Sequence, residues 1–499
     1  MQPTAHTAES SFTKNRVMAL LNVLFGIVLL TGCNSGSNAP ATGTYTPGTS
    51  PPGGGGGGIS TGGNSPTQIG TPHSTDFILS PPQIALNDSD AAVAVWQETD
   101  QTQTTGAQKL WATVRSNNSW GTAIAIDSLG SADPRVAMDP NGQIIVVWSR
   151  NSPTGNPPNN TLWSLRYIDG RWQTAQLISK TPTSDNTAYP LSPAVATDSN
   201  GHIMVVWTDN GLTGSSTRSI WATHYDGSNW SPAQTLSDGT HTAYEARVAA
   251  SGLDNFTVVW TQDTNVQAPP GPAAVTMPNL WTRRYSSGTW STDAVPIGLT
   301  GLVAGDGAAH LNLSMNSGGD AIVVWEQAHG TQVSIASNRY QTSAGWGTAT
   351  LIDNAGTPAS APVVALDNTG NAIAVWRQAD GRTLNAWTSG SSAGASWQIP
   401  TQLGSLGVNV ENIRIGMDMA GNALTIWQQN PTGSFNPALV TRRYLSATGG
   451  WGSASTLSLA GTDMALDVNS AGKALVVAKH SVNNGLGPLT APWALPYQP

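Results

Sequence analysis

The chain has 499 residues, of which only 10% are charged, while 54 are glycine and 20 are tryptophan. The formal net charge is −8, which argues against a basic nucleic-acid-binding protein. We therefore expect no nucleic-acid partner. Apolar residues make up 39% of the chain, which argues against a fully disordered protein. The length is sufficient for two or three ordinary domains or for one large all-β domain.

The N-terminal residues have the pattern of a secretion signal. Lys14 and Arg16 precede an apolar run from Val17 to Leu30, which at about 14 residues is shorter than the roughly 20 that a transmembrane helix needs. The run ends in Leu30-Thr31-Gly32-Cys33, which resembles the lipobox of bacterial lipoproteins. The resemblance implies cleavage after residue 32 and a lipid on Cys33, and Asn34 as the next residue suggests the outer membrane or cell surface. The alternative is an ordinary signal peptide followed by a chance cysteine.

Cys33 is the only cysteine, so a disulfide within the chain and a thiolate metal site are both excluded. Gly, Ser, Thr, Pro and Asn dominate residues 34–75, a composition typical of a flexible tether. The sequence therefore predicts a signal peptide at 1–32, a lipidated cysteine and tether at 33–75, and a folded domain at 76–499.

One unit repeats eight times in that domain. An apolar segment ends every 51–65 residues, and the final residues of these segments are Trp96, Trp148, Trp207, Trp260, Trp325, Trp376, Trp427 and Ala478. An Asn, Asp or Ser stands nine residues before each of them. Glycine stands six residues before in six copies, and Asp90 and Asp254 take its place in the first and fourth. This spacing predicts a tight turn between the first and second strands of each unit.

Two further strands follow in each unit. The third strand carries Trp111, Trp163, Trp221, Trp281 or Trp493, and the fourth opens at Trp120, Trp172, Trp230, Trp290, Trp346, Trp397 or Trp451. Trp387 fits neither register, and helical periodicity is absent. The pattern predicts an all-β fold, a β-propeller with eight four-stranded blades, with seven blades as the alternative.

The eighth unit ends one strand short, after a third strand at Trp493–Tyr497. Asp76-Phe77-Ile78-Leu79-Ser80 stands directly before the first unit, where the missing strand would belong. We therefore expect an N-terminal strand at 76–80 to complete the last blade and close the ring.

The third-strand tryptophans are the candidate ligand-binding residues. Some units lack a tryptophan in this strand, whereas the tryptophans at core positions recur in almost every unit. Three pairs combine an aromatic face with a polar group: Trp163 with Arg166, Trp221 with His224, and Trp281 with Arg283 or Arg284. Such pairs suit sugars, which stack on aromatic rings and bond to fixed polar groups. The alternative is that these residues only shield the outer edge of each blade.

The repeats resemble the Asp-box repeats of sialidase-type propellers and the blades of fucose-binding propeller lectins. They depart from the Asp box because Ala137 precedes Asp139 and Trp148 comes six residues after Gly142. They depart from the lectins because a repeated Glu is missing, although Arg166, Arg283 and Arg339 could supply the arginine of such a site.

The residues favour binding over catalysis. Glu326 and Asp209 break the repeat as single acidic residues would in an active site, but ordinary surface variation explains them better. No histidine pair has metal-ligand spacing, and no cofactor is predicted. We expect a lipid-anchored cell-envelope protein that binds a glycan or a protein partner. The alternatives are a sialidase-like glycoside hydrolase and a scaffold without a small-molecule site.

Overall fold

A computed structural model describes residues 65–74, 76–102, 107–152, 159–179, 190–210, 217–267, 274–354, 356–381, 383–405, 407–430, 437–483 and 488–497. The predicted signal peptide, Cys33 and most of the predicted tether lie outside these residues. In the part of the chain so described, no helix is long and apolar enough to cross a membrane.

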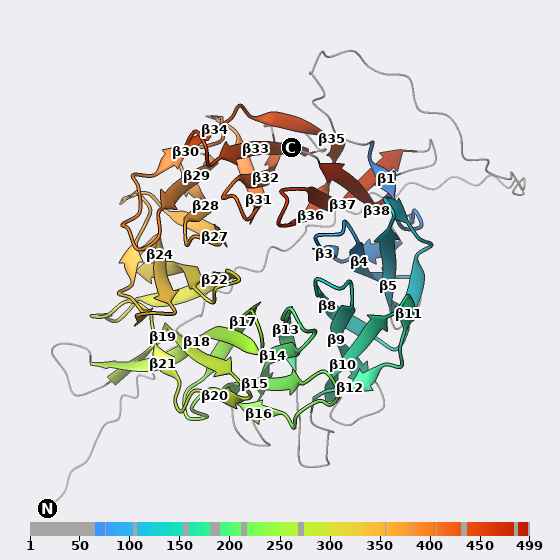
Figure 1. The fold of residues 1–499 in the computed structure, drawn as a ribbon. Helices are drawn as coiled ribbons and strands as arrows, with labels where there is room; N and C mark the ends of the chain where they lie inside the picture. The colour runs from blue at the N-terminus through green and yellow to red at the C-terminus, as the bar shows by residue number, and fades with distance from the viewer. Residues whose placement is uncertain are drawn as a thin grey trace, which may run out of the picture. The chain divides into compact units, whose positions relative to one another are not determined.

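The described residues form eight antiparallel sheets arranged as the blades of a propeller (Figure 1). The prediction of eight blades is confirmed. In most blades the fourth strand is interrupted and pairs with the third as two short segments. The first four blades comprise β2 (Phe77–Leu79), β3 (Gln83–Leu86), β4 (Ala92–Asp100), β5 (Ala107–Ser116), β6 (Ser119–Trp120) and β7 (Ile124–Asp127); β8 (Ser131–Met138), β9 (Ile144–Ser152), β10 (Asn159–Ile168), β11 (Arg171–Trp172) and β12 (Gln176–Leu177); β13 (Leu191–Thr197), β14 (Ile203–Asn210), β15 (Arg218–Tyr225) and β16 (Gln234–Thr235); and β17 (Ala243–Ser251), β18 (Asn255–Gln267), β19 (Ala274–Ser286), β20 (Thr289–Trp290) and β21 (Val295–Pro296).

The last four blades follow the same order, with the innermost strand first in the chain (Figure 1). They comprise β22 (Gly307–Met315), β23 (Ala321–His329), β24 (Gln332–Gln341), β25 (Gly345–Trp346) and β26 (Thr350–Leu351); β27 (Ala359–Leu366), β28 (Ala372–Ala379), β29 (Leu384–Ser391) and β30 (Thr401–Gln402); β31 (Asn409–Met417), β32 (Ala423–Asn430), β33 (Ala438–Leu445), β34 (Gly450–Trp451) and β35 (Ser455–Ala460); and β36 (Thr462–Val468), β37 (Ala474–Asn483) and β38 (Pro488–Tyr497), which are joined by β1 (Thr67–Gln68).

The second-strand tryptophans form the core, as their recurrence predicts. All seven are at most 1% exposed, and their alternating apolar neighbours on the same strands are buried as well. Most of these indole N–H groups donate to the side chain two residues later in the strand, for example Trp260 to Gln262 at 3.0 Å and Trp325 to Gln327 at 3.0 Å. The repeat thus buries a large ring in each of these blades, and most of the indole N–H groups have a hydrogen-bond acceptor in the same strand.

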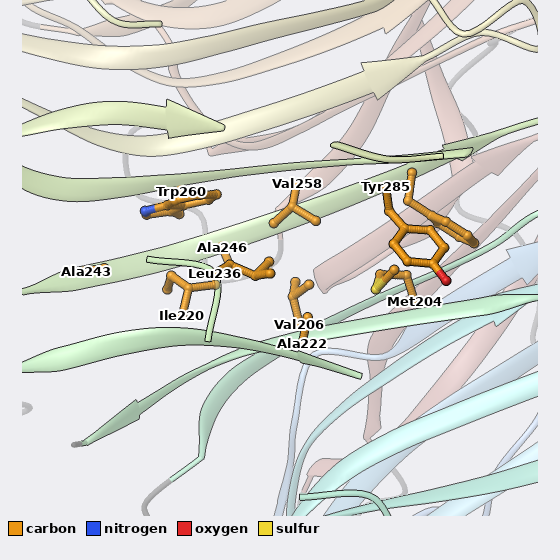
Figure 2. Packing of buried hydrophobic residues seen from close by; sticks show 11 residues of the cluster. Met204, Val206, Ile220, Ala222, Leu236, Ala243, Ala246, Val258, Trp260 and Tyr285 are labelled. Atoms are coloured by element: carbon orange, nitrogen blue, oxygen red, sulfur yellow. The ribbon is translucent and has the colours of Figure 1, made fainter. Parts of the chain in front are cut away.

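Blades pack against one another through shared apolar clusters. Figure 2 shows one of them, in which Met204, Val206 and Ile220 of the third blade meet Val258 and Trp260 of the fourth. Third-strand tryptophans lie beside such clusters and are half-buried. Trp387 belongs to this set, because it lies opposite Trp376 in the same register as Trp163 opposite Trp148. The expectation that Trp387 is out of register is therefore wrong.

The turns between first and second strands have the predicted geometry. The side chain of Asp367 accepts the backbone N–H groups of Thr369 and Asn371, and Gly370 has a φ of 87°. Asp90 and Asp254, which replace glycine in two blades, also adopt left-handed φ values of 62° and 48°. Left-handed backbone is uncommon for residues other than glycine, although aspartate tolerates it better than most.

An N-terminal strand closes the ring, but it is not the strand that the sequence predicts. Ile78 pairs with Thr99 of β4, within the first blade, and is 51% exposed. The closing strand is β1, whose Thr67 and Gln68 pair with Ala494 and Trp493 of β38. The propeller therefore begins before residue 76, and residues 65–74 belong to it rather than to a tether.

The contacts of Ile69 and Gly70 explain why this segment is ordered. Ile69 is 5% exposed and packs with apolar residues of the first and last blades. Its backbone N–H donates to the carbonyl of Pro492 at 3.0 Å. A Cβ atom on Gly70 would lie 2.6 Å from Pro492 and 2.8 Å from Trp96, so the chain can pass between these rings only because residue 70 is glycine.

Candidate functional site

The six residues predicted to bind a ligand lie on the third strands of three successive blades, β10, β15 and β19. Trp163 and Arg166 are three residues apart on β10, so their side chains point to opposite faces of the sheet. The indole of Trp163 is covered instead by Arg150, whose guanidinium carbon lies 3.9 Å from the ring centroid. Arg150 is itself held by Asp127 at 2.8 Å.

Arg166 and His224 each contact the tyrosine of the next blade. Arg166 lies over Tyr225 at 4.2 Å and donates to its hydroxyl. His224 lies 3.2 Å from the hydroxyl of Tyr285, measured from Nδ1. Arg284 stacks on Tyr340 at 3.7 Å in the next interface. These contacts form a repeated link between neighbouring blades.

Trp221 and Trp281 pack beside the inter-blade clusters, and Arg283 bonds within its own blade. Its guanidinium donates to the carbonyls of Ser291 and Thr292 at 2.9 and 3.1 Å. The pairs Trp163–Arg166 and Trp221–His224 divide between the two faces of their sheets, whereas Trp281 and Arg283 share a face.

A second candidate site, which the sequence analysis did not identify, lies on the propeller axis. The first strands of the blades surround this axis (Figure 1). Among the described first strands, seven of eight contain a β-bulge, and the bulged residue has a φ of about 50°. The seven bulged residues are Asp133, Ser192, Glu245, His310, Ala361, Asn412 and Asp463. A bulge interrupts the alternation of a strand and redirects the side chains on either side of it.

The redirected side chains line a pocket of about 680 Å³. Arg135, Arg247 and Arg414 occupy the same place in three blades, each two residues after the bulged residue. Each donates to the carbonyl of the preceding residue, at 2.9, 3.0 and 2.8 Å. Burial lowers the pKa of Arg135 and of Arg414 from the usual value for arginine, which reflects how far these charges are removed from solvent.

Arg377 of β28 is the fourth arginine of this pocket. In the fifth and seventh blades, the residue equivalent to Arg377 bonds to the bulged residue of its own blade. Glu326 bonds to His310, and Gln428 bonds to Asn412. In the sixth blade the bulged residue is Ala361, which offers no such group. Within the described part of the chain, the buried Nε of Arg377 has no hydrogen-bond partner.

Two glutamates share the pocket with the arginines. Glu245 accepts the backbone N–H of His310 at 2.7 Å, and Glu326 accepts that of Ala361 at 2.7 Å, so each carboxylate holds the bulge of the next blade. Glu326 also bonds to Nδ1 of His310 at 2.8 Å, and this hydrogen bond raises the pKa of His310 above its usual value. Asp209, the other acidic residue that breaks the repeat, does not line this pocket.

The lining carries four arginines and two glutamates, a formal charge of 4 − 2 = +2 with His310 neutral, in a chain whose net charge is −8. Asp133 and Asp463 lie close enough to Arg135 and Arg414 to offset part of this charge. Guanidinium groups favour carboxylate and sulfate oxygens, while the glutamates and the amides of Asn312 and Asn412 can bond to hydroxyls. The pocket can therefore hold a small polar ligand that carries an acidic group.

No protein-family model matches this sequence, and no curated protein matches it either. Among solved structures, the β-propeller domain of the Trilobed protease from Pyrococcus furiosus is 8% identical and aligns over 77% of this chain and 97% of that one, with a TM-score of 0.43. A polysaccharide lyase of family PL25, an ulvan lyase, is 10% identical over 82% of this chain and 92% of its own, with a TM-score of 0.42. The GH93 α-L-arabinofuranosidase of Fusarium graminearum is 11% identical over 63% and 92%, with a TM-score of 0.37. At this level of similarity, these neighbours say nothing about what the present chain binds or catalyses.

Proposed function

We propose that this chain is a lipid-anchored protein of the bacterial cell envelope that binds an acidic glycan in the axial pocket. The observation that carries the proposal is the convergence of Arg135, Arg247, Arg377 and Arg414 on one pocket in a chain with few charges. The volume of about 680 Å³ lies in the range of small-molecule sites and suits a short oligosaccharide better than a folded partner.

Lipid anchoring is supported by the apolar run and by Leu30-Thr31-Gly32-Cys33. Cys33→Ser removes the only thiol that could carry a lipid. We expect the wild-type protein to incorporate labelled fatty acid and to sediment with membranes, and the variant to do neither. Membrane association unchanged in the variant would contradict the anchor.

The binding proposal is tested by calorimetry with uronate-containing oligosaccharides, with neutral oligosaccharides of equal length as the control ligands. We expect binding of the acidic series and a loss of at least about tenfold in affinity for Arg414→Gln, because one good charge-assisted hydrogen bond corresponds to about 1.5–3 kcal/mol. Arg283→Gln at the outer edge is the matched control, and Trp163→Ala tests the site at the outer edge of the blade. Binding that depends on Trp163 but not on Arg414 would move the site to the outer edge. Absence of any binding to the acidic series would refute the proposal.

The two glutamates favour glycoside hydrolysis as a second candidate. Glu245 and Glu326 both bond to His310 in the same pocket, and a glycosidase needs two carboxylates about one sugar bond. Both also hold backbone N–H groups, which is a structural role and the reason that we favour binding. Turnover of chromogenic glycosides that disappears in Glu326→Gln, with the variant still folded, would establish the enzyme instead.

A further inference from the structure

Three side chains that could bind a metal ion converge between the third and fourth blades. His202 directly follows the turn between β13 and β14, His224 is on β15, and Asp254 is in the turn between β17 and β18. One nitrogen of each histidine and one oxygen of Asp254 all lie within 4.8 Å of one another. The three residues are separated by 22 and 30 positions in the sequence, so no short metal-binding motif predicts the site.

Nε2 of His224 and Oδ1 of Asp254 are close without being hydrogen-bonded. Nε2 of His224 lies 2.9 Å from Oδ1 of Asp254, and Nδ1 of His202 lies 3.8 Å from the same oxygen. Nε2 of His224 and Oδ1 of Asp254 are both buried, and in the described part of the molecule neither has a hydrogen-bond partner, because the ring N–H is not aligned with the oxygen. Ligands of a tetrahedral zinc ion, with bonds of about 2.0–2.1 Å, stand about 3.3 Å apart. The separation of 2.9 Å between Nε2 of His224 and Oδ1 of Asp254 is close to that value, and the whole set lies within 4.8 Å.

The surrounding groups orient these side chains. Oδ2 of Asp254 accepts the backbone N–H of Gly288 at 2.6 Å, which leaves Oδ1 facing the histidines. The hydroxyl of Tyr285 lies 3.2 Å from Nδ1 of His224 and can accept its proton when Nε2 binds an ion. Oδ2 of Asp198 accepts the Nδ1–H of His202 at 2.9 Å, so an ion that binds this nitrogen must replace that proton. Metal-binding histidines in proteins usually have an oxygen partner on the other ring nitrogen, as His224 has in Tyr285.

Each of the three residues departs from the repeat. Glycine occupies the position of Asp254 in six blades, and Asp254 adopts the left-handed backbone there with a φ of 48°. Arginine occupies the position of His224 in four blades, as Arg166, Arg284, Arg339 and Arg443. No other blade has histidine at the position of His202. His224 keeps the link to the tyrosine of the next blade, and His202 keeps the bond to its turn aspartate that Asn371 makes to Asp367. What is particular to this interface is that both residues are histidine and that an aspartate faces them.

We propose that His202, His224 and Asp254 form a binding site for a divalent transition-metal ion. Two imidazoles and one carboxylate are the donors that zinc prefers, and three protein ligands leave one position open. The side chain of His202 is 24% exposed and that of Asp254 is 18% exposed, so an ion can enter from solvent.

The test is calorimetric titration of the untagged, chelator-treated protein with Zn²⁺, together with the visible absorption of a Co²⁺-loaded sample. We expect one Zn²⁺ per chain and a tetrahedral Co²⁺ spectrum. His202→Asn and Asp254→Gly should each weaken Zn²⁺ binding at least tenfold and abolish the Co²⁺ spectrum. Asp254→Gly restores the glycine found in most blades at a left-handed position, so this variant is expected to fold.

Asp90→Gly is the matched control, because Asp90 occupies the same turn position in the first blade and has no histidine beside it. Its Zn²⁺ affinity should equal that of the wild-type protein. Absence of stoichiometric Zn²⁺ binding, or equal affinity in the wild type and Asp254→Gly, would overturn the proposal. Equal loss in Asp90→Gly and Asp254→Gly would also overturn it, because the effect would then not belong to this site.

Discussion

Two inter-blade interfaces carry the same substitution, but its side chain makes different contacts in each. One interface closes the ring between the eighth and first blades, and the other joins the third and fourth blades. Both place aspartate where most blades have glycine, as Asp90 and Asp254. At the closing interface Lys473 pairs with Asp90, and Asn469 donates to it at 3.2 Å. At the other interface the equivalent of Lys473 is His202, and Oδ1 of Asp254 faces two imidazoles without a hydrogen bond.

This difference shows how a repeat protein acquires a site. The backbone position is the same in both interfaces, and the neighbouring residues differ: Lys473 pairs with Asp90, whereas His202 and His224 face Asp254. At the closing interface the ion pair adds to the link that β1 makes between the eighth blade and the first.

The largest expected effect concerns the closing strand. Ile69→Ala removes a buried side chain and leaves a cavity between the first and last blades, so we expect the free energy of unfolding to fall by about 2–4 kcal/mol. Ile78→Ala, at the residue that the sequence assigned to closure, should change it by less than about 0.5 kcal/mol, because that side chain is exposed. Denaturant midpoints of both variants measure the contrast. Equal effects of the two substitutions would mean that β1 does not close the ring.

An intermediate effect is expected for Asp467, which is another feature of the closing interface. Its carboxylate accepts the backbone N–H of Leu86 at 2.7 Å, and burial raises its pKa to about 6. This pKa exceeds the value of about 3.9 in the unfolded chain, so the folded protein binds the proton more tightly. The contribution of Asp467 to stability therefore falls as pH rises from about 4 to about 6. The shift corresponds to about 2–3 kcal/mol at neutral pH.

Asp467→Asn keeps an acceptor for Leu86 and removes the charge. We expect it to raise the free energy of unfolding at pH 7 by about 2 kcal/mol and to leave it nearly unchanged at pH 4, where the wild-type side chain is protonated. Denaturation at the two pH values measures both effects. A variant that is less stable than the wild type at pH 7 would show that the charge itself strengthens this interface.

The smallest effects on stability are expected for the two turn aspartates. Asp90→Gly loses a partly exposed ion pair, worth about 1 kcal/mol or less, and the hydrogen bond from Asn469, and gains a residue suited to left-handed backbone. Asp254→Gly loses one hydrogen bond to Gly288 and has the same backbone gain. In metal-free buffer we expect both variants to unfold within about 1 kcal/mol of the wild type. Added Zn²⁺ should stabilise the wild type and Asp90→Gly but not Asp254→Gly, as thermal shifts would show.

The architecture was predictable because the repeat is a local signal. The spacing of the second-strand tryptophans, the Asx and glycine positions of the turns and the short strands between them all lie within one unit. The closing strand was not predictable in the same way. Thr67, Gln68 and Ile69 offer a single apolar residue, whereas Phe77-Ile78-Leu79 has the stronger strand pattern and pairs within its own blade.

The candidate sites were harder to predict because they depend on contacts between units. Trp163 and Arg166 are close in sequence, but their odd separation on a strand puts them on opposite faces. The axial pocket depends on bulges, which interrupt the alternation that sequence analysis relies on. One signal was available: Arg135, Arg247 and Arg414 all stand 13 residues before the second-strand tryptophan of their blades, and an alignment of the units would have placed them together.

The two-residue strand β1 also decides how the molecule responds to force. A pull on the chain N-terminal to the propeller acts first on the pairs Thr67–Ala494 and Gln68–Trp493, and then on Ile69 and the narrow passage at Gly70. Force directed away from the blade breaks these pairs one after another, whereas force along the strand loads them together. Once β1 is detached, β38 presents an unpaired edge that can accept a strand from another molecule. Tension on the N-terminal chain would thus expose a surface for association.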